Sequence, residues 1–270
     1  MTPAKINIAV TGAAGRMGKM VIGAVSTDDG LKLTGAAEAP GNPAVGTDAG
    51  TGAGAGELGV PITDDIRAAI EEADVLIDFS TPESTLKAVI AAADKKVAVV
   101  TGTTAIDDAG VAEIKKHSEA IPIVMAPNMS MCVTLLFKLA GEVAEFLGDD
   151  FDVEIVEAHH NQKVDAPSGT AKRLFEIISK ALKRDPKEVG VYGREGVIGK
   201  RTGKEIGVFA VRAGDIVGEH TVIFGGIGER LELVHKAHSR MNFVRGAVRA
   251  SKWIKGKPPG LYNMSDVLGI

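Results

Sequence analysis

The chain has 270 residues, nearly twice the length of about 150 residues typical of one domain, so two domains or one domain with a large insertion are expected. Its 31 Lys and Arg residues and 35 Asp and Glu residues give a formal net charge of −4, and 45% of the residues are hydrophobic. This balance excludes a mainly disordered chain and a protein that coats nucleic acid with a basic surface; together with the 33 glycines, it favours an α/β enzyme.

Short apolar runs of strand length alternate with segments of helical spacing in the first half of the chain. The expected strands are Ile6–Val10, Leu31–Ala37, Val75–Phe79, Val97–Val100 and Ile121–Met125. Apolar residues recur at helical spacing between them, as in Met17–Val25 and Leu86–Ala93, and Thr81 followed by Pro82 is a favourable helix start. This alternation predicts a parallel sheet covered by helices on both faces.

A glycine-rich turn, Val10–Gly18, directly follows the first expected strand and opens the first expected helix. Its GxxGxxG spacing permits a tight turn with close backbone approach, and the helix N-terminus offers N–H groups to a pyrophosphate. Glu38, where the second strand ends, is placed to accept hydrogen bonds from a ribose diol. The predicted dinucleotide contacts are Gly12, Ala13, Ala14, Gly15, Arg16, Met17 and Glu38. The alternative is that the glycines only permit close packing of the helix on the strand.

Three further strand ends carry small polar residues or turns. Ligands of open parallel sheets bind at the carboxyl ends of the strands, so we expect these segments to form the rim of a nicotinamide pocket, although each alone could be an ordinary loop. One of them is Phe79–Thr81. Backbone groups of the other two are expected to hold the nicotinamide carboxamide: Gly102, Thr103, Thr104, Ala126, Pro127, Asn128 and Met129.

Past about residue 130 the pattern changes. Residues 135–146 predict one longer helix, Phe151–Ile155 predicts a half-exposed strand, and a further helix is expected near residues 169–182. Three strand-like runs with short connections then favour a mixed or antiparallel sheet: Ile206–Val211, Val217–Phe224 and Leu231–Ala237.

These elements predict an α/β fold with two domains. A Rossmann-type parallel sheet domain that binds the dinucleotide comprises residues 1–130 plus 240–270, because the last helical segment, Met241–Ile254, is expected to return to it. Residues 131–239 are expected to form an inserted α+β domain with a mixed sheet, which binds substrate and supports oligomerisation.

A second glycine-rich segment and the single cysteine are interpreted as structural. Gly50–Gly56 follows no expected strand and opens no expected helix, so we predict a mobile surface loop. Cys132 is predicted to be a small buried core residue.

No run approaches the roughly 20 apolar residues that span a bilayer, and Ile6–Val10 is too short for a secretion signal, so a cytoplasmic protein without a membrane partner is expected.

The densest polar run is Glu157–Ala171, between an expected strand and an expected helix. Ser168 is placed as the N-cap of that helix, so the two N–H groups that follow it would point outward toward a carboxylate. Histidine is also the side chain most readily poised to give a proton near neutral pH. The run therefore predicts a site for an anionic substrate that needs protonation. The substrate-binding candidates are His160, Lys163, Ser168, Gly169 and Thr170.

A metal site is the rival interpretation, because His159, His160, His235 and His238 are four potential ligands. Adjacent residues of an extended strand face opposite ways, and no Cys or carboxylate cluster completes a tetrahedral set, so no metal is expected. His235 and His238 are then expected to be solvated or to lie between domains. A purely structural loop remains the other alternative for the polar run.

Together, these motifs resemble the dihydrodipicolinate reductase family of the diaminopimelate and lysine pathway. Val10–Gly18 is similar to the family's V-x-G-x-x-G-R-M-G, and His159–Ala171 to its H-H-x-x-K-x-D-A-P-S-G-T-A, with the resemblance covering nearly the whole chain. It implies a Rossmann domain completed by the C-terminal tail, an inserted mixed-sheet domain that builds a homotetramer, and NAD(P)H-dependent reduction of a cyclic dicarboxylate, 4-hydroxy-tetrahydrodipicolinate, to tetrahydrodipicolinate.

The resemblance also implies roles for individual residues. Hydride reaches ring carbon C4 of the substrate and leaves an enamine that must be protonated. His159 would be the general acid/base and Lys163 would donate at the same centre. The substrate carboxylate would be held by His160, Gly169 and Thr170.

One position departs from part of the family and bears on the cofactor. Many members carry Arg directly after the acidic residue, whereas here Glu38 is followed by Ala39. A carboxylate without an adjacent cation repels a 2′-phosphate, so we expect a preference for NADH, although Arg16 could still serve NADPH. Two other classes stay open: a nicotinamide reductase for a semialdehyde or a sugar, and a non-catalytic dinucleotide sensor.

Overall fold

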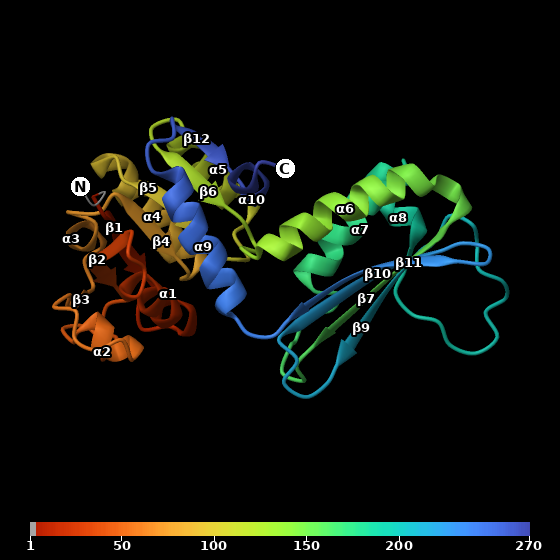
Figure 1. Ribbon diagram of the computed structural model, residues 1–270, viewed down its shortest axis with the longest axis horizontal. Helices are drawn as coiled ribbons and strands as arrows, with labels where there is room; N and C mark the ends of the chain where they lie inside the picture. The colour runs from red at the N-terminus through yellow and green to blue at the C-terminus, as the bar shows by residue number, and fades with distance from the viewer. Residues whose placement is uncertain (1–3) are drawn as a thin grey trace. The chain divides into compact units, whose positions relative to one another are not determined.

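The computed structural model describes residues 4–270, which divide into two compact units. The first unit comprises residues 4–131 and 241–269, and the second comprises residues 132–240 (Figure 1). Within the described residues, no helix combines the length and the apolar character needed to cross a bilayer.

The first unit contains a seven-stranded parallel sheet with strand order β12-β6-β5-β4-β1-β2-β3, which confirms the predicted parallel sheet. All five strands expected in the first half of the chain are present. The strands are β1 (Ile6–Thr11), β2 (Leu31–Ala37), β3 (Ile62–Thr63), β4 (Val75–Asp78), β5 (Ala98–Thr101), β6 (Pro122–Met125) and β12 (Gly260–Tyr262). Every residue of β4 and β5 is buried, which explains their continuous apolar runs.

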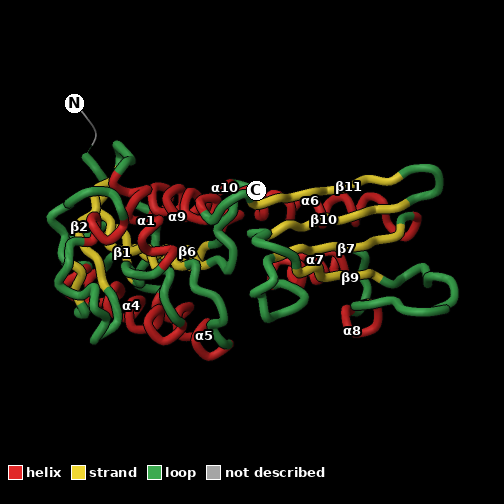
Figure 2. Tube along the Cα trace, turned by 90° about the horizontal axis from the view of Figure 1, so that it is seen from below, coloured by secondary structure: helices red, strands yellow, loops and turns green. Residues whose placement is uncertain are grey.

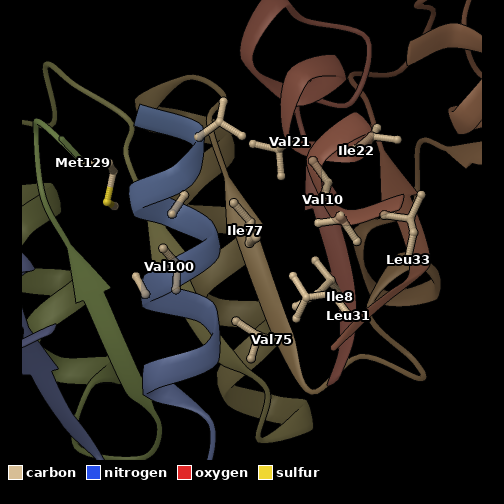
Figure 3. Close-up of a cluster of buried hydrophobic side chains, with 14 of the residues drawn as sticks. Ile8, Val10, Val21, Ile22, Leu31, Leu33, Val75, Ile77, Val100 and Met129 are labelled. Atoms are coloured by element: carbon tan, nitrogen blue, oxygen red, sulfur yellow. The ribbon is translucent and has the colours of Figure 1, made fainter. Parts of the chain in front are cut away.

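Helices cover both faces of this sheet. Ile8 and Ile77 face a core shared with α1 and α9 (Figure 3), whereas Leu76 and Val99 face a second core shared with α4 and α5. Thr81 caps α4 and Pro82 is its first residue, as predicted. The helices are α1 (Arg16–Ser26), α2 (Ala49–Ala53), α3 (Ile66–Ala69), α4 (Pro82–Lys95), α5 (Asp108–His117), α9 (Met241–Ile254) and α10 (Met264–Leu268).

The segment Gly50–Gly56 is not the irregular loop that we expected. Its first half belongs to the short helix α2, which Asp48 caps by accepting the Thr51 N–H at 2.8 Å. Gly50 is buried, and a Cβ there would lie 2.3 Å from the Gly56 carbonyl oxygen. The prediction of a loop that opens no helix was wrong because it overlooked the cap residue directly before the glycines.

The second unit contains a five-stranded mixed sheet with strand order β11-β10-β7-β9-β8, and Figure 2 shows its four longer strands side by side. β10 runs antiparallel to both β7 and β11, whereas β7 and β8 run parallel to β9, as the predicted mixed sheet requires. The strands are β7 (Asp152–His159), β8 (Gly190–Val191), β9 (Ile206–Arg212), β10 (Gly218–Gly225) and β11 (Arg230–Ala237).

Helices of the second unit pack on one face of its sheet (Figure 1). Leu136 and Leu174 from two of these helices meet Ile155 and Val222 from the strands in one buried core. The helical elements are α6 (Met131–Leu147), the 3₁₀ turn Gly148–Asp150, α7 (Gly169–Ala181) and α8 (Pro186–Val189).

Cys132 lies near the start of α6 and is exposed, so the prediction of a buried cysteine was wrong. The buried residues of α6 include Val133, Leu136 and Ala140, which define the inward side of the helix. The residue type alone does not reveal which side of a helix it occupies; the phase of the surrounding apolar residues decides it.

Candidate active site

The glycine turn after β1 has the shape that a dinucleotide needs. Gly12 has φ +67°, and a Cβ there would lie 2.6 Å from the Phe79 carbonyl oxygen. A Cβ at Gly18 would lie 2.1 Å from the Gly12 carbonyl oxygen, so the first turn of α1 approaches the loop very closely. α1 begins after Gly15, and no side chain of the described residues caps it, which leaves its first N–H groups for an anion. Arg16 is exposed beside them.

Glu38 follows β2 and lies against the glycine turn. Its carboxylate accepts the Ala14 N–H at 2.9 Å and the Ala39 N–H at 2.9 Å. The next residue, Ala39, is exposed and carries no charge. The carboxylate is therefore held next to the expected pyrophosphate site, in a position suited to a ribose diol.

The other cofactor candidates lie where β5 and β6 end, at the same carboxyl edge of the sheet. A Cβ at Gly102 would lie 2.2 Å from the Phe79 ring, and the Ala126 N–H donates to the Thr101 carbonyl at 3.2 Å. Met129 is buried in the core, so only its backbone is suited to a ligand (Figure 3). Asn128 accepts the Ser130 N–H at 2.9 Å. The structure thus brings the cofactor candidates together in the first unit.

In the second unit, β7 is longer than predicted and carries a buried carboxylate. The inward residues Val153 and Ile155 are followed by Glu157, whose exposed fraction is 0%. Arg212 donates to both Glu157 oxygens, at 2.8 and 2.8 Å, and the Ser168 N–H donates at 2.9 Å. The contact between Glu157 and Arg212 was not predicted from the sequence, although the two-residue alternation of β7 already placed Glu157 on the inward face.

His159 lies on the same face of β7 as Glu157 and donates from Nδ1 to the carboxylate at 2.7 Å. Burial favours a raised pKa of Glu157, but the hydrogen bonds from Arg212 and His159 outweigh it and hold the pKa below its ordinary value. The ionised carboxylate fixes His159 with its proton on Nδ1 and leaves Nε2 free. A Cβ at Gly218 would lie 3.0 Å from this Nε2, so glycine leaves the space beside it open.

Burial is the main cause that lowers the pKa of His159, and Glu157 partly opposes it. The positive charges of Lys163 and Arg212 also lower the pKa. His159 is therefore mostly neutral at neutral pH. Its side chain is 12% exposed, which is enough to reach a ligand from the surface.

A row of histidines continues from this site across the sheet. His220 pairs across the strands with Glu157 on one side and with His235 on the other. Burial foremost lowers the pKa of His220 to about 3, and its Nε2 lies 3.0 Å from the Ser168 hydroxyl. The rings of His220 and His235 are 6.4 Å apart. His235 on β11 is half-buried and His238 is exposed, as the expectation of a solvated residue requires for His238.

The start of α7 forms the open side of this site. Ser168 caps the helix by accepting the Ala171 N–H at 3.2 Å, as predicted. Gly169 is exposed and a Cβ there would meet nothing within 4 Å, while Thr170 is half-buried in the same turn. These groups surround an accessible helix N-terminus.

Two candidates lie in the loop between β7 and α7. The Lys163 side chain donates from Nζ to Asp165 at 2.7 Å, and its backbone N–H donates to the carbonyl of half-buried His160 at 3.1 Å. All substrate candidates therefore belong to the second unit, whereas all cofactor candidates belong to the first.

Over residues 4–270, no group of three or more His, Cys, Asp or Glu side chains is arranged to hold a metal ion.

Comparisons with known proteins agree on one family. The family model described as "Dihydrodipicolinate reductase, N-terminus" matches residues 6–129, and "Dihydrodipicolinate reductase, C-terminus" matches residues 132–268. The chain is 54% identical over 265 residues to the 4-hydroxy-tetrahydrodipicolinate reductase of Geotalea daltonii, covering 98% of this chain and 99% of the relative. It is also 54% identical to that of Geobacter sulfurreducens, with 97% and 98% covered.

A solved structure has the same architecture. The dipicolinate-bound dihydrodipicolinate reductase from Paenisporosarcina sp. TG-14 superposes with a TM-score of 0.75 and 25% sequence identity, covering 96% of this chain and 97% of that one. The similarity therefore extends through both units.

Proposed function

The chain belongs to the dihydrodipicolinate reductase family, and we propose that it reduces 4-hydroxy-tetrahydrodipicolinate to tetrahydrodipicolinate with a reduced nicotinamide cofactor. Such a protein is an oxidoreductase of diaminopimelate and lysine biosynthesis. The observation that carries the residue assignments is the Glu157–His159 pair beside the open start of α7. It combines a positioned proton donor with an anion site, which a cyclic dicarboxylate that gains a proton requires.

We propose that the glycine turn holds the cofactor pyrophosphate, with Glu38 on the adenosine ribose and the loops at residues 102–104 and 126–129 on the carboxamide. The residues fit this group, because the turn leaves no room for a Cβ at Gly12 or Gly18 and the start of α1 is uncapped. The bound cofactor supplies the hydride. Glu38 accepts two backbone N–H groups, and the exposed residue that follows it, Ala39, carries no charge, which supports NADH as the preferred cofactor over NADPH.

The start of α7 is the proposed grip on a substrate carboxylate. The N–H groups of Gly169 and Thr170 provide donors on an accessible helix N-terminus, and Ser168 holds the backbone there. His160 and Lys163 lie in the preceding loop and would add donors to the same anion. The pairing of Lys163 with Asp165 holds the amine within this loop.

His159 is the proposed general acid/base. Its Nδ1 is committed to Glu157, so protons pass through Nε2. Glu157 stabilises the protonated ring, whereas burial and the nearby cations favour the neutral ring. His159 can therefore give up a proton readily near neutral pH. Lys163 would assist at the same centre and replace the proton.

We also propose a homotetramer in the cytoplasm, where the reduced cofactor is found. The face of the second sheet opposite its helices carries a cross-strand row of Phe209, Val156, Thr221 and Val234, and Val234 is 50% exposed. This regular row of three apolar side chains and one threonine suits pairing with a second copy of the chain. Sedimentation of the full chain should give the mass of four chains, and a monomer would contradict the assembly.

The test of the function is a coupled assay. The product of dihydrodipicolinate synthase is supplied, and oxidation of NADH is followed by absorbance. Turnover with this substrate and none with aspartate semialdehyde or a sugar is expected. Binding of NADH without turnover of the cyclic substrate would instead favour a dinucleotide sensor, and turnover of a semialdehyde alone would favour another reductase.

A further inference from the structure

Asp78 is a buried carboxylate at the last position of β4, with an exposed fraction of 0%. Oδ1 accepts hydrogen bonds from the hydroxyls of Thr11 at 2.6 Å and Ser80 at 2.5 Å. Oδ2 accepts three more, from Thr85 at 2.6 Å, Thr101 at 2.8 Å and Thr103 at 2.8 Å. Such short distances are typical of hydroxyls that donate to a carboxylate. Five hydroxyl dipoles thus stabilise this buried charge.

The donors come from the segments that surround the carboxyl edge of the sheet. Thr11 on β1 and Thr101 on β5 are the direct cross-strand neighbours of Asp78, so the three residues form the last row of the sheet. Ser80 and Thr103 belong to the loops that follow β4 and β5. Asp78 therefore connects both loops to the strand ends.

The orientation of these hydroxyls also determines which backbone groups they hold. Each hydroxyl has one hydrogen, and because it is directed at Asp78, the oxygen lone pairs face away from the carboxylate. Thr103 Oγ1 accepts the Ser80 N–H at 3.0 Å, and Thr101 Oγ1 accepts the Thr103 N–H at 3.3 Å. The carboxylate thereby orders the two loops at once.

The glycine turn depends less on this network. Gly15 N–H donates to the Gly12 carbonyl at 3.0 Å, and Ala13 N–H donates to the Ala37 carbonyl at 3.1 Å. Glu38 holds Ala14 in addition. Thr11, which precedes Gly12, also donates to Asp78, but the turn itself is held by these backbone bonds and by Glu38, whereas Ser80 and Thr103 in the loops after β4 and β5 bind Asp78 directly.

We propose that Asp78 is a positioning residue that orders the two loops receiving the nicotinamide half of the cofactor. This inference rests on the proposed function, because it takes the loop at residues 102–104 as part of the nicotinamide rim. Asp78 acts through Ser80, Thr101 and Thr103 and does not touch the cofactor itself.

The test compares NADH with ADP-ribose, which lacks the nicotinamide. Calorimetric titration of the full chain measures both dissociation constants in the wild type and in Asp78→Asn. An amide places a donor where Asp78 accepts, so the hydroxyls lose their common orientation. We expect NADH binding to weaken by about tenfold, the equivalent of one or two hydrogen bonds, while ADP-ribose binding stays within about twofold. Equal weakening of both ligands, or no weakening of NADH binding, would overturn the proposal.

A matched pair of variants decides the question even if Asp78→Asn does not fold. Thr101 and Thr85 are both fully buried and both donate to Asp78 Oδ2, but only Thr101 also accepts the Thr103 N–H. Thr101→Val is expected to weaken NADH binding several-fold relative to ADP-ribose, and Thr85→Val is expected to leave that ratio unchanged. Equal ratios in the two variants contradict the proposal.

The wild type separates this inference from the proposed function. A wild type that neither binds NADH nor oxidises it with the cyclic substrate refutes the function. A wild type that does both, with unchanged selectivity in Asp78→Asn and Thr101→Val, refutes only the role of Asp78.

Discussion

Glu157 and His159 lie two residues apart on the inward face of β7, and the Glu157 carboxylate accepts a hydrogen bond from His159 Nδ1 at 2.7 Å. The same carboxylate is held by Arg212 and by the Ser168 N–H. The orientation of the proposed proton donor and the start of the proposed carboxylate site are therefore linked through one buried group. A change at Glu157 should affect both.

Replacing His159 tests its assignment as the proton donor. His159→Gln is expected to lower kcat by about 10²- to 10⁴-fold, the usual contribution of a positioned acid, with little change in the affinity for NADH. Steady-state kinetics and cofactor titration measure the two effects. His238→Gln, at an exposed histidine, is the control and should keep the wild-type rate. An unchanged rate in His159→Gln would move the role to Lys163 or to water.

Replacing Glu157 should shift the pH profile toward acid. Glu157 raises the pKa of His159, so Glu157→Gln lowers that pKa further. Because the protonated ring gives the proton, kcat/KM declines as pH rises through the pKa of His159, and this decline should begin at lower pH in the variant. Glu154→Gln is the matched control, since Glu154 is on the same strand but pairs with Arg194 and Arg201. A decline that stays in place or moves to higher pH contradicts the role of Glu157.

Buried His220 should make the stability depend on pH. Its pKa is about 3 in the folded chain against 6.5 as the ordinary value, so the unfolded chain binds the extra proton between these values. The free energy of unfolding should therefore fall as pH decreases from about 6.5 toward 3, by up to about 1.4 kcal/mol per pH unit from this group. Urea unfolding between pH 6.5 and 5 measures the slope, where most carboxylates remain ionised.

His220→Asn should reduce that slope, because Asn does not titrate. His238→Asn removes an exposed histidine and should leave the slope as in the wild type. His159 and His235 contribute in the same direction, since the pKa of each is lowered mainly by burial, so some slope remains in His220→Asn. A slope identical to that of the wild type would show that His220 is not buried in its neutral form.

The exposed residue after Glu38 should control the choice of cofactor. The wild type is expected to have a higher kcat/KM with NADH than with NADPH. Ala39→Arg places a cation beside the ribose site and should raise the NADPH to NADH ratio by about tenfold or more. Ala39→Met, of similar length but uncharged, should not. A wild type that favours NADPH would contradict our interpretation of Glu38.

Much of this architecture was predictable from the sequence because it depends on short-range patterns. Continuous apolar runs predicted buried parallel strands, and Ser168 and Thr81 are recognisable as helix caps from their residue type and position. The glycine turn and the polar run from His159 also identified the family. The sequence by itself thus determined the fold class and the family. It also indicated which residues are expected to bind the dinucleotide and which to bind and protonate the substrate.

Only the tertiary structure revealed the groups that hold those residues in place. Asp78 accepts a hydrogen bond from Thr11, which is 67 residues away in the sequence on β1. The hydrogen bond between Arg212 and Glu157 spans 55 residues, and that between His220 and Ser168 spans 52. Such partners are set by strand order and register, which local periodicity does not encode. A charged residue within an apolar strand indicates that a partner exists, but its identity depends on which distant strand lies alongside.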